Sequence, residues 1–228
     1  GAWVKFVSEA SKTISLKIGT SFTSIENARV NLDTEIGNKS FAQVRDESKT
    51  EWNKALSQIK VECEDSVKLR KFYSALYCSR LMPRTFSDVN GAYPGFSQFY
   101  NTYRTNGFTY YCDFSVWDTY RALQPLLTIL QPKMDGEMIQ SYMIKGKLGG
   151  WLPTFPLWNN YTAAMIGDHG LSIIGDAIMK NIPGFDYEEA YELMRKNAFT
   201  ENENRQSYIN GKGRRAMESY LKYGYIPL

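Results

Sequence analysis

A series of helix-like patterns after residue 40 constrains the fold of this chain more than any other feature. The apolar side chains of each pattern recur at helical spacing, and Ser40, Asp135 and Asp186 stand where N-caps of three of the helices are expected. The patterns occupy residues 41–59, 66–82, 135–149, 168–183 and 186–196. Because such apolar stripes must be buried against other elements, the sequence predicts a mainly helical fold.

The first 36 residues are expected to differ from the rest. Residues 13–18 alternate polar and apolar side chains, the period of a half-buried strand, and Gly19 with the Ser and Thr residues after it continues in extended form. One or two strands do not form a stable sheet alone, so we expect strand partners upstream of Gly1.

Composition excludes several classes of function. The chain has 228 residues and a net charge of +3, with charges of both signs dispersed along it, which argues against a nucleic-acid surface. No run of about eighteen apolar residues is present, so no membrane span is expected, and the first residues lack the pattern of a signal peptide.

The stretch 113–121, Asp-Phe-Ser-Val-Trp-Asp-Thr-Tyr-Arg, carries the main candidate site. Ser115 and Asp118 have the spacing of an N-cap and its N3 partner, so a helix is expected to begin here and to continue to about Leu130. Pro125 should bend this helix unless the helix begins only near that residue. An indole beside a carboxylate suits a sugar, because the ring of Trp117 covers a C–H face while Asp118 accepts hydrogen bonds from hydroxyls. The alternative is that Asp118 only satisfies backbone donors and Trp117 belongs to the core.

Three further segments hold candidate residues, each with a structural alternative. The turn-rich loop 83–95 carries Asp88 and could bend over a pocket, or Asp88 could bond only its own backbone. Residues 151–158 contain two tryptophans and a phenylalanine, which suit either sugar stacking or core packing. Asp168 and His169 could face a ligand, although Asp168 is also well placed as an N-cap.

Several motifs together resemble the calcium-dependent alpha-mannosidases of glycoside hydrolase family 92. They keep their order along nearly the whole chain, and they are residues 17–29, 113–123, Gly-Gly-Trp-Leu-Pro at 149–153, Met-Ile-Gly-Asp-His at 165–169 and Asp-Ala at 176–177. By this resemblance Trp117 and Asp118 match the mannose-binding tryptophan and aspartate of the family. Asp168 and His169 match its Gly-Asp-His pattern.

The resemblance also implies an architecture. Residues 1–36 would be the last strands of a β-sandwich domain, residues 37–65 a helical linker, and residues 66–228 about half of an (α/α)6 toroid, whose other half would follow or bind as a separate chain.

The resemblance implies an inverting, exo-acting alpha-mannosidase, of an alpha-1,2 type, that removes mannose from glycans outside the cytoplasm, in the periplasm or extracellular space. The catalytic acid, the catalytic base and the calcium ligands would lie in motifs beyond residues 225–227, so no catalytic or metal-binding residue is assigned in this chain. The alternative is a noncatalytic helical scaffold or carbohydrate-binding fragment that pairs with another chain.

Overall fold

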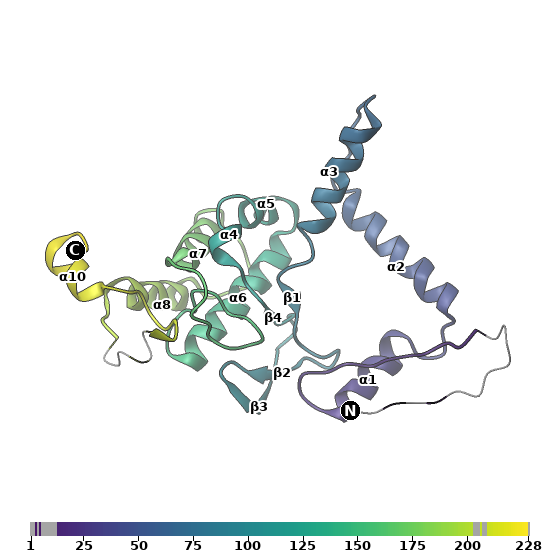
Figure 1. The fold of residues 1–228 in the computed structure, drawn as a ribbon, viewed down its shortest axis with the longest axis horizontal. Coiled ribbons are helices and arrows are strands. Elements are labelled where there is room, and N and C mark those ends of the chain that lie inside the picture. The colour runs from purple at the N-terminus through teal and green to yellow at the C-terminus, as the bar shows by residue number, and fades with distance from the viewer. Residues whose placement is uncertain (1–2, 4, 6–12, 203–205, 207–208, 228) are drawn as a thin grey trace.

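The structure is a computed structural model that describes residues 3, 5, 13–202, 206 and 209–227. It is mainly helical, as predicted, with two small antiparallel sheets (Figure 1). The elements are α1 (Ile25–Glu35), α2 (Phe41–Leu56), α3 (Ser66–Cys78), β1 (Arg84–Thr85), β2 (Ala92–Gly95), β3 (Gln98–Arg104), β4 (Tyr111–Cys112), α4 (Val116–Thr119), α5 (Leu123–Leu130), α6 (Pro132–Gly149), α7 (His169–Met179), α8 (Tyr187–Phe199) and α10 (Met217–Tyr223).

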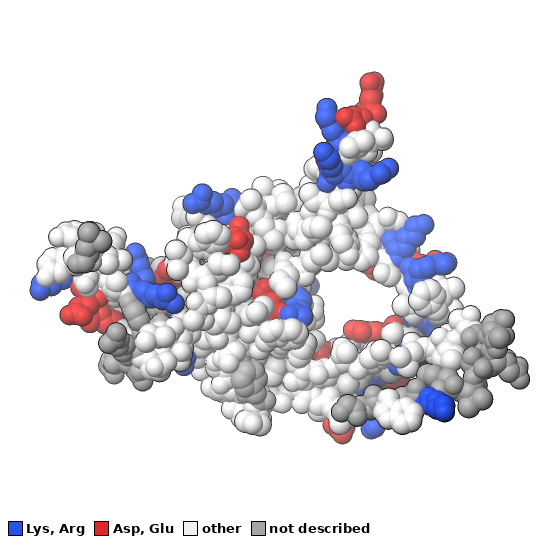
Figure 2. Space-filling view, viewed as in Figure 1, with Lys and Arg blue, Asp and Glu red and all other residues white. Residues whose placement is uncertain are grey.

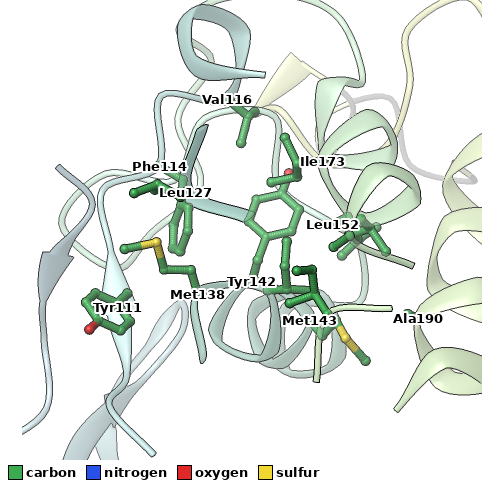
Figure 3. Packing of buried hydrophobic residues seen from close by; sticks show 14 residues of the cluster. Tyr111, Phe114, Val116, Leu127, Met138, Tyr142, Met143, Leu152, Ile173 and Ala190 are labelled. Atoms are coloured by element: carbon green, nitrogen blue, oxygen red, sulfur yellow. The ribbon is translucent and has the colours of Figure 1, made fainter. Parts of the chain in front are cut away.

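Helix α6 is the centre of the main body, where it contacts α5, α7 and α8. Its buried face carries Met138, Ile139, Tyr142 and Met143, which pack against residues from the neighbouring helices (Figure 3). Tyr142 is fully buried, and its hydroxyl donates to the carbonyl oxygen of Pro153. Burying an apolar side chain of this size stabilises the fold by about 1.5–3 kcal/mol, so this cluster is the main source of stability of the body.

The two sheets lie against this body. Strands β1 and β4 pair antiparallel, and β4 contacts α6. Strands β2 and β3 form a hairpin whose turn is residues 96–97, with Ser97 in the left-handed conformation at φ +57. A second buried cluster is formed by residues in and next to these strands, Phe86, Tyr93, Tyr110 and Cys112. Isolated pairs of strands are unstable, so contacts with the body must maintain both sheets.

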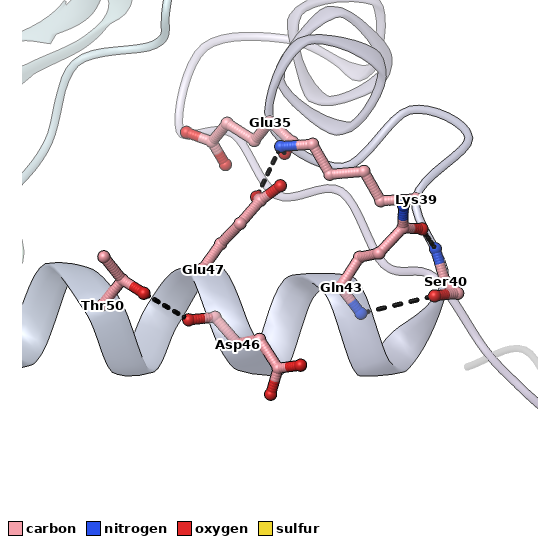
Figure 4. Close-up of polar contacts among 7 residues, drawn as sticks. All are labelled: Glu35, Lys39, Ser40, Gln43, Asp46, Glu47 and Thr50. Atoms are coloured by element: carbon pink, nitrogen blue, oxygen red, sulfur yellow. Dashed lines mark hydrogen bonds and ion pairs between the residues drawn. The ribbon is translucent and has the colours of Figure 1, made fainter.

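Helices α1, α2 and α3 form an arm that leaves the body, and Figure 2 shows an opening between the arm and the body. No residue of α1 or α2 is buried, whereas α3 buries Leu76. Local interactions support the arm. Ser40 caps α2 in a capping box with Gln43, as the sequence predicts for the cap, and Lys39 pairs with Glu47 at 2.7 Å (Figure 4).

The strand expected at residues 13–18 is not present, whereas the part of this prediction that concerns residues 1–12 lies almost entirely outside the described residues. Residues 13–24 form no strand, and helix α1, which the sequence interpretation missed, occupies Ile25–Glu35. Ser24 caps this helix by accepting a hydrogen bond of 3.0 Å from the backbone N–H of Asn27. The apolar residues of the alternating segment are exposed, so the described residues place no sheet or core over them.

Two further helix boundaries differ from those expected. The predicted helix from Ser115 to Leu130 is split into α4, which ends at Thr119, and α5, which begins at Leu123. Pro125 therefore lies in the first turn of α5, where a missing backbone N–H costs little. Helix α6 begins at Pro132, so Asp135 lies in its first turn and does not cap it. By contrast, Asp186 caps α8 as predicted, accepting from the N–H of Glu189 at 2.9 Å.

Candidate functional site

The Trp117–Asp118 pair lies in the single turn of α4, with both side chains exposed. Val116, fully buried, anchors the turn to the core, and the carbonyl oxygen of Ser115 accepts the backbone N–H of Asp118 at 3.1 Å. Ser115 makes no side-chain cap; its hydroxyl donates to the Asp118 carboxylate, which corrects the expected N-cap and N3 pair. The indole is 43% exposed, so the alternative of a core tryptophan does not hold in this chain.

Asp113, four residues earlier, gives this segment its rigid base. It adopts φ +65, an unusual conformation for a residue other than glycine, although Asp tolerates it better than most. Its carboxylate is fully buried, pairs with the Nε of Arg84 and accepts the backbone N–H of Trp158 at 2.7 Å. The sequence interpretation assigned Asp113 no role, because its partners come from β1 and from the loop after α6.

The Asp168–His169 pair lies close to this turn, since α7 begins at His169 and contacts α4. The imidazole stacks on Tyr120, with ring centroids 4.1 Å apart and planes at 11°. Partial burial, together with the positive charge of Arg121, lowers the pKa of His169, so the neutral imidazole is favoured at this position. The structure thus brings both predicted pairs onto neighbouring elements.

Asp168 occupies the N-cap position of α7 but makes no side-chain cap. Its Oδ1 accepts from Asn197 at 3.4 Å, while its Oδ2 is buried without a hydrogen-bond partner among the described residues. Burial raises the pKa of Asp168, and the contact with Asn197 and the charge of Arg214 oppose this shift. An unpaired buried carboxylate oxygen is costly unless something bonds it, so this side chain remains a candidate for ligand contact.

Asp88 lies apart from these pairs, in the loop between β1 and β2. Its carboxylate accepts hydrogen bonds from the hydroxyls of Ser21 and Thr23 and from the side-chain amide of Asn31 at 2.7 Å. These bonds tie the segment before α1, and α1 itself, to the loop. The structure therefore shows an architectural role for Asp88, and its predicted contact with substrate stays a prediction.

A buried lysine binds the backbone of β4, next to the segment that carries Asp113. Lys145 of α6 is fully buried, and its ammonium donates to the carbonyl oxygens of Tyr111 at 2.5 Å and Ser141 at 3.3 Å. It also lies 3.9 Å from the ring centroid of Tyr110. Burial lowers the pKa of Lys145 to about 8, opposed by Cys112 and Asp113. The signal in the sequence was its spacing, because Lys145 follows Met138 and Tyr142 by seven and three residues and so lies on the apolar face of α6.

No group of three or more His, Cys, Asp or Glu side chains that could hold a metal occurs among the described residues. Likewise, no helix within the described ranges is long and apolar enough to cross a membrane.

The body is mainly helical and presents an indole and a carboxylate at a helix start, with a second acid and a histidine on the adjacent helix, residue types that suit a carbohydrate ligand. The chain belongs to glycosyl hydrolase family 92: the sequence model of the Glycosyl hydrolase family 92 catalytic domain matches residues 27–228.

Solved structures and a curated protein support this assignment. A family GH92 alpha-mannosidase from Bacteroides thetaiotaomicron is 31% identical, with a TM-score of 0.80 over 91% of this chain and 26% of its own. A Family GH92 inverting mannosidase from the same organism is 31% identical, with a TM-score of 0.81 over 91% of this chain and 27% of its own. An uncharacterized secreted glycosidase from Arthroderma benhamiae is 25% identical over 221 residues, which are 94% of this chain and 23% of that protein. The chain thus spans about a quarter of the length of these relatives.

Proposed function

We propose that this chain is part of an exo-acting, inverting alpha-mannosidase, of an alpha-1,2 type, and that it supplies contacts to the nonreducing mannose of a glycan. Membership of family 92 and the similarity to an inverting mannosidase support this proposal. The observation that carries it is the exposure of Trp117 and Asp118 side by side on α4, in the motif that resembles the mannose-binding pair of the family.

The chemistry of the pair suits a terminal hexose. The indole of Trp117 offers an apolar face to the C–H groups of the pyranose, and the Asp118 carboxylate accepts hydrogen bonds from its hydroxyls. Inversion requires a second element, a pair of carboxyl groups about 6.5–9.5 Å apart with a water between them. We assign neither the acid nor the base to this chain and propose that both lie in the remainder of the enzyme, as in the (α/α)6 toroid that the resemblance implies.

Replacing Asp118 with Ala in the complete enzyme tests this role. Loss of a charged acceptor at the sugar should lower kcat/KM for an aryl alpha-mannoside by about 10²–10³-fold, while the circular-dichroism spectrum stays unchanged. Glu188→Gln is a matched control, because Glu188 is also an exposed acid in the first turn of a helix. Activity of Asp118→Ala equal to that of the control would remove Asp118 from the site.

Calcium and an extracytoplasmic location complete the proposal. The ion would be held by residues outside the described part of this chain, and loss of activity after exhaustive chelation, with recovery on adding calcium, would support it. A periplasmic or extracellular location agrees with the secreted relative, and fractionation of producing cells tests it.

A further inference from the structure

The exposed indole of Trp158 has no role in the function proposed above. It stands at the tip of a two-residue hairpin, where Leu157 and Asn160 exchange backbone hydrogen bonds of 3.1 Å in both directions. Trp158 is 56% exposed although the guanidinium of Arg84 covers one face of its ring, 4.2 Å from the centroid. More than half of the surface of this residue is therefore accessible. Phe22 also contacts the indole, with ring centroids 6.4 Å apart and planes at 64°.

The backbone holds this indole in place against its own preference. Trp158 has φ +50 and Asn159 φ +57, and such values are rare for a bulky residue. The Asp113 carboxylate accepts the N–H of Trp158, while the side chain of Asn159 donates to Pro94 at 2.8 Å and accepts from the hydroxyl of Tyr110 at 2.8 Å. Backbone strain that the surroundings enforce in this way is concentrated at ligand-binding sites.

Trp158 lies on a segment that is bonded to the one carrying the Trp117–Asp118 pair. The backbone N–H of Phe114 donates to the carbonyl oxygen of Pro156 at 3.2 Å, so the segments 113–117 and 156–158 begin side by side. Four residues of extended chain span at most about 14 Å, so the Cα atoms of Asp113 and Trp117 lie within that distance of each other. Asp113 is also the residue whose carboxylate accepts the backbone N–H of Trp158. The two exposed tryptophans therefore stand on segments that are hydrogen-bonded to each other.

We propose that Trp158, backed by Arg84, forms a second carbohydrate subsite, which stacks on the sugar to which the departing mannose is attached. This inference rests on the proposed function. A pyranose needs an apolar surface for its C–H face, and the indole supplies it. Arg84 holds the ring from its other face, because its guanidinium stacks on the indole while its Nε pairs with the buried Asp113. Trp158 is thus a specificity-determining residue for the leaving group.

Comparison of two substrates tests the subsite in the complete enzyme. Alpha-mannobiose has a sugar as its leaving group, whereas alpha-mannosyl fluoride has a single atom that cannot reach Trp158. For Trp158→Ala, the ratio of kcat/KM for mannobiose to that for the fluoride should fall about tenfold, equivalent to about 1.4 kcal/mol, mainly through KM for mannobiose. Trp158→Phe keeps an aromatic face and should recover most of the ratio. Tyr191→Ala is the control, because Tyr191 is 55% exposed on α8, and its ratio should equal that of the wild type.

The outcomes separate the subsite from the proposed function. If the wild-type enzyme hydrolyses both substrates and Trp158→Ala leaves the ratio of kcat/KM values unchanged, the subsite alone is overturned. Burial of the indole by other parts of the enzyme would give this result. An equal loss on both substrates also overturns it, since Trp158 would then act on the mannose or on the fold. A wild-type enzyme that hydrolyses neither substrate refutes the proposed function and the subsite with it.

Discussion

Replacing Asp113 should show how much stability the buried carboxylate gives to the site region. In Asp113→Ala the backbone N–H of Trp158 loses its acceptor, which costs about 1–3 kcal/mol for a buried donor. Arg84 loses its partner, but its side chain is 35% exposed, so solvent reduces that loss to about 1 kcal/mol or less. Alanine at φ +65 adds about 1 kcal/mol of backbone strain. We expect a total loss of about 3 kcal/mol.

Two companion substitutions separate these contributions. Asp113→Asn keeps an acceptor for Trp158 and tolerates the positive φ, so only the charge is lost and the cost should be about 1 kcal/mol. Asp113→Gly loses the carboxylate but removes the strain, so it should be more stable than Asp113→Ala by about 1 kcal/mol. The expected order of stability is therefore wild type, Asn, Gly and Ala.

Urea denaturation followed by tryptophan fluorescence measures this order. With a slope m of about 3 kcal/mol/M, a loss of about 3 kcal/mol lowers the midpoint by about 1 M. Asp113→Ala within about 0.5 kcal/mol of the wild type would refute the role of the buried carboxylate. Equal midpoints for Ala and Gly would instead refute the contribution of the backbone conformation.

Two other predictions concern α6 and its neighbours. Burial, and to a smaller extent the charge of Asp176, raises the pKa of Asp135 to about 7. The native state therefore binds this proton more tightly than the unfolded chain does. The free energy of unfolding should then fall as the pH rises from about 4 to about 7. Asp135→Asn cannot ionise and should flatten this dependence, with a gain in the free energy of unfolding of up to about 4 kcal/mol above pH 7. Urea denaturation at several pH values measures this, and the same pH dependence of stability in both proteins would contradict it. Gly136→Ala should lose about 1–3 kcal/mol, since its Cβ would lie 1.8 Å from a carbonyl oxygen of the loop after α7. Its control, Gly175→Ala, meets nothing closer than 3.7 Å and should gain about 0.5–1 kcal/mol; thermal unfolding checks the pair, and a similar melting temperature for both would count against the contact.

Much of the secondary structure was predictable from short stretches of the sequence. The caps at Ser40 and Asp186 and the end of α6 at Gly149–Gly150 agree with the structure, because a cap depends on side chains a few residues away. The errors have an equally local origin. The alternation of residues 13–18 led to an extended reading of the whole start of the chain, although Ser24 caps a helix there. The helix expected after Ser115 is interrupted at residues 120–122, where Ala122 at φ −131 leaves the helical conformation before α5 begins.

The sequence by itself determined the mainly helical class, the family resemblance and the candidate Trp117–Asp118 pair, because each depends on residue types within a short span. Only the tertiary structure showed that Asp113 joins Arg84, 29 residues away, and Trp158, 45 residues away, and that Lys145 lies buried under β4. Which distant side chains meet is decided by how α6, β1 and β4 pack together, and no periodicity along the chain encodes that packing. The sequence identified one indole beside a carboxylate and left the tryptophans of residues 151–158 between stacking and core packing, and the fold showed that Trp158 is exposed and held by a buried acid.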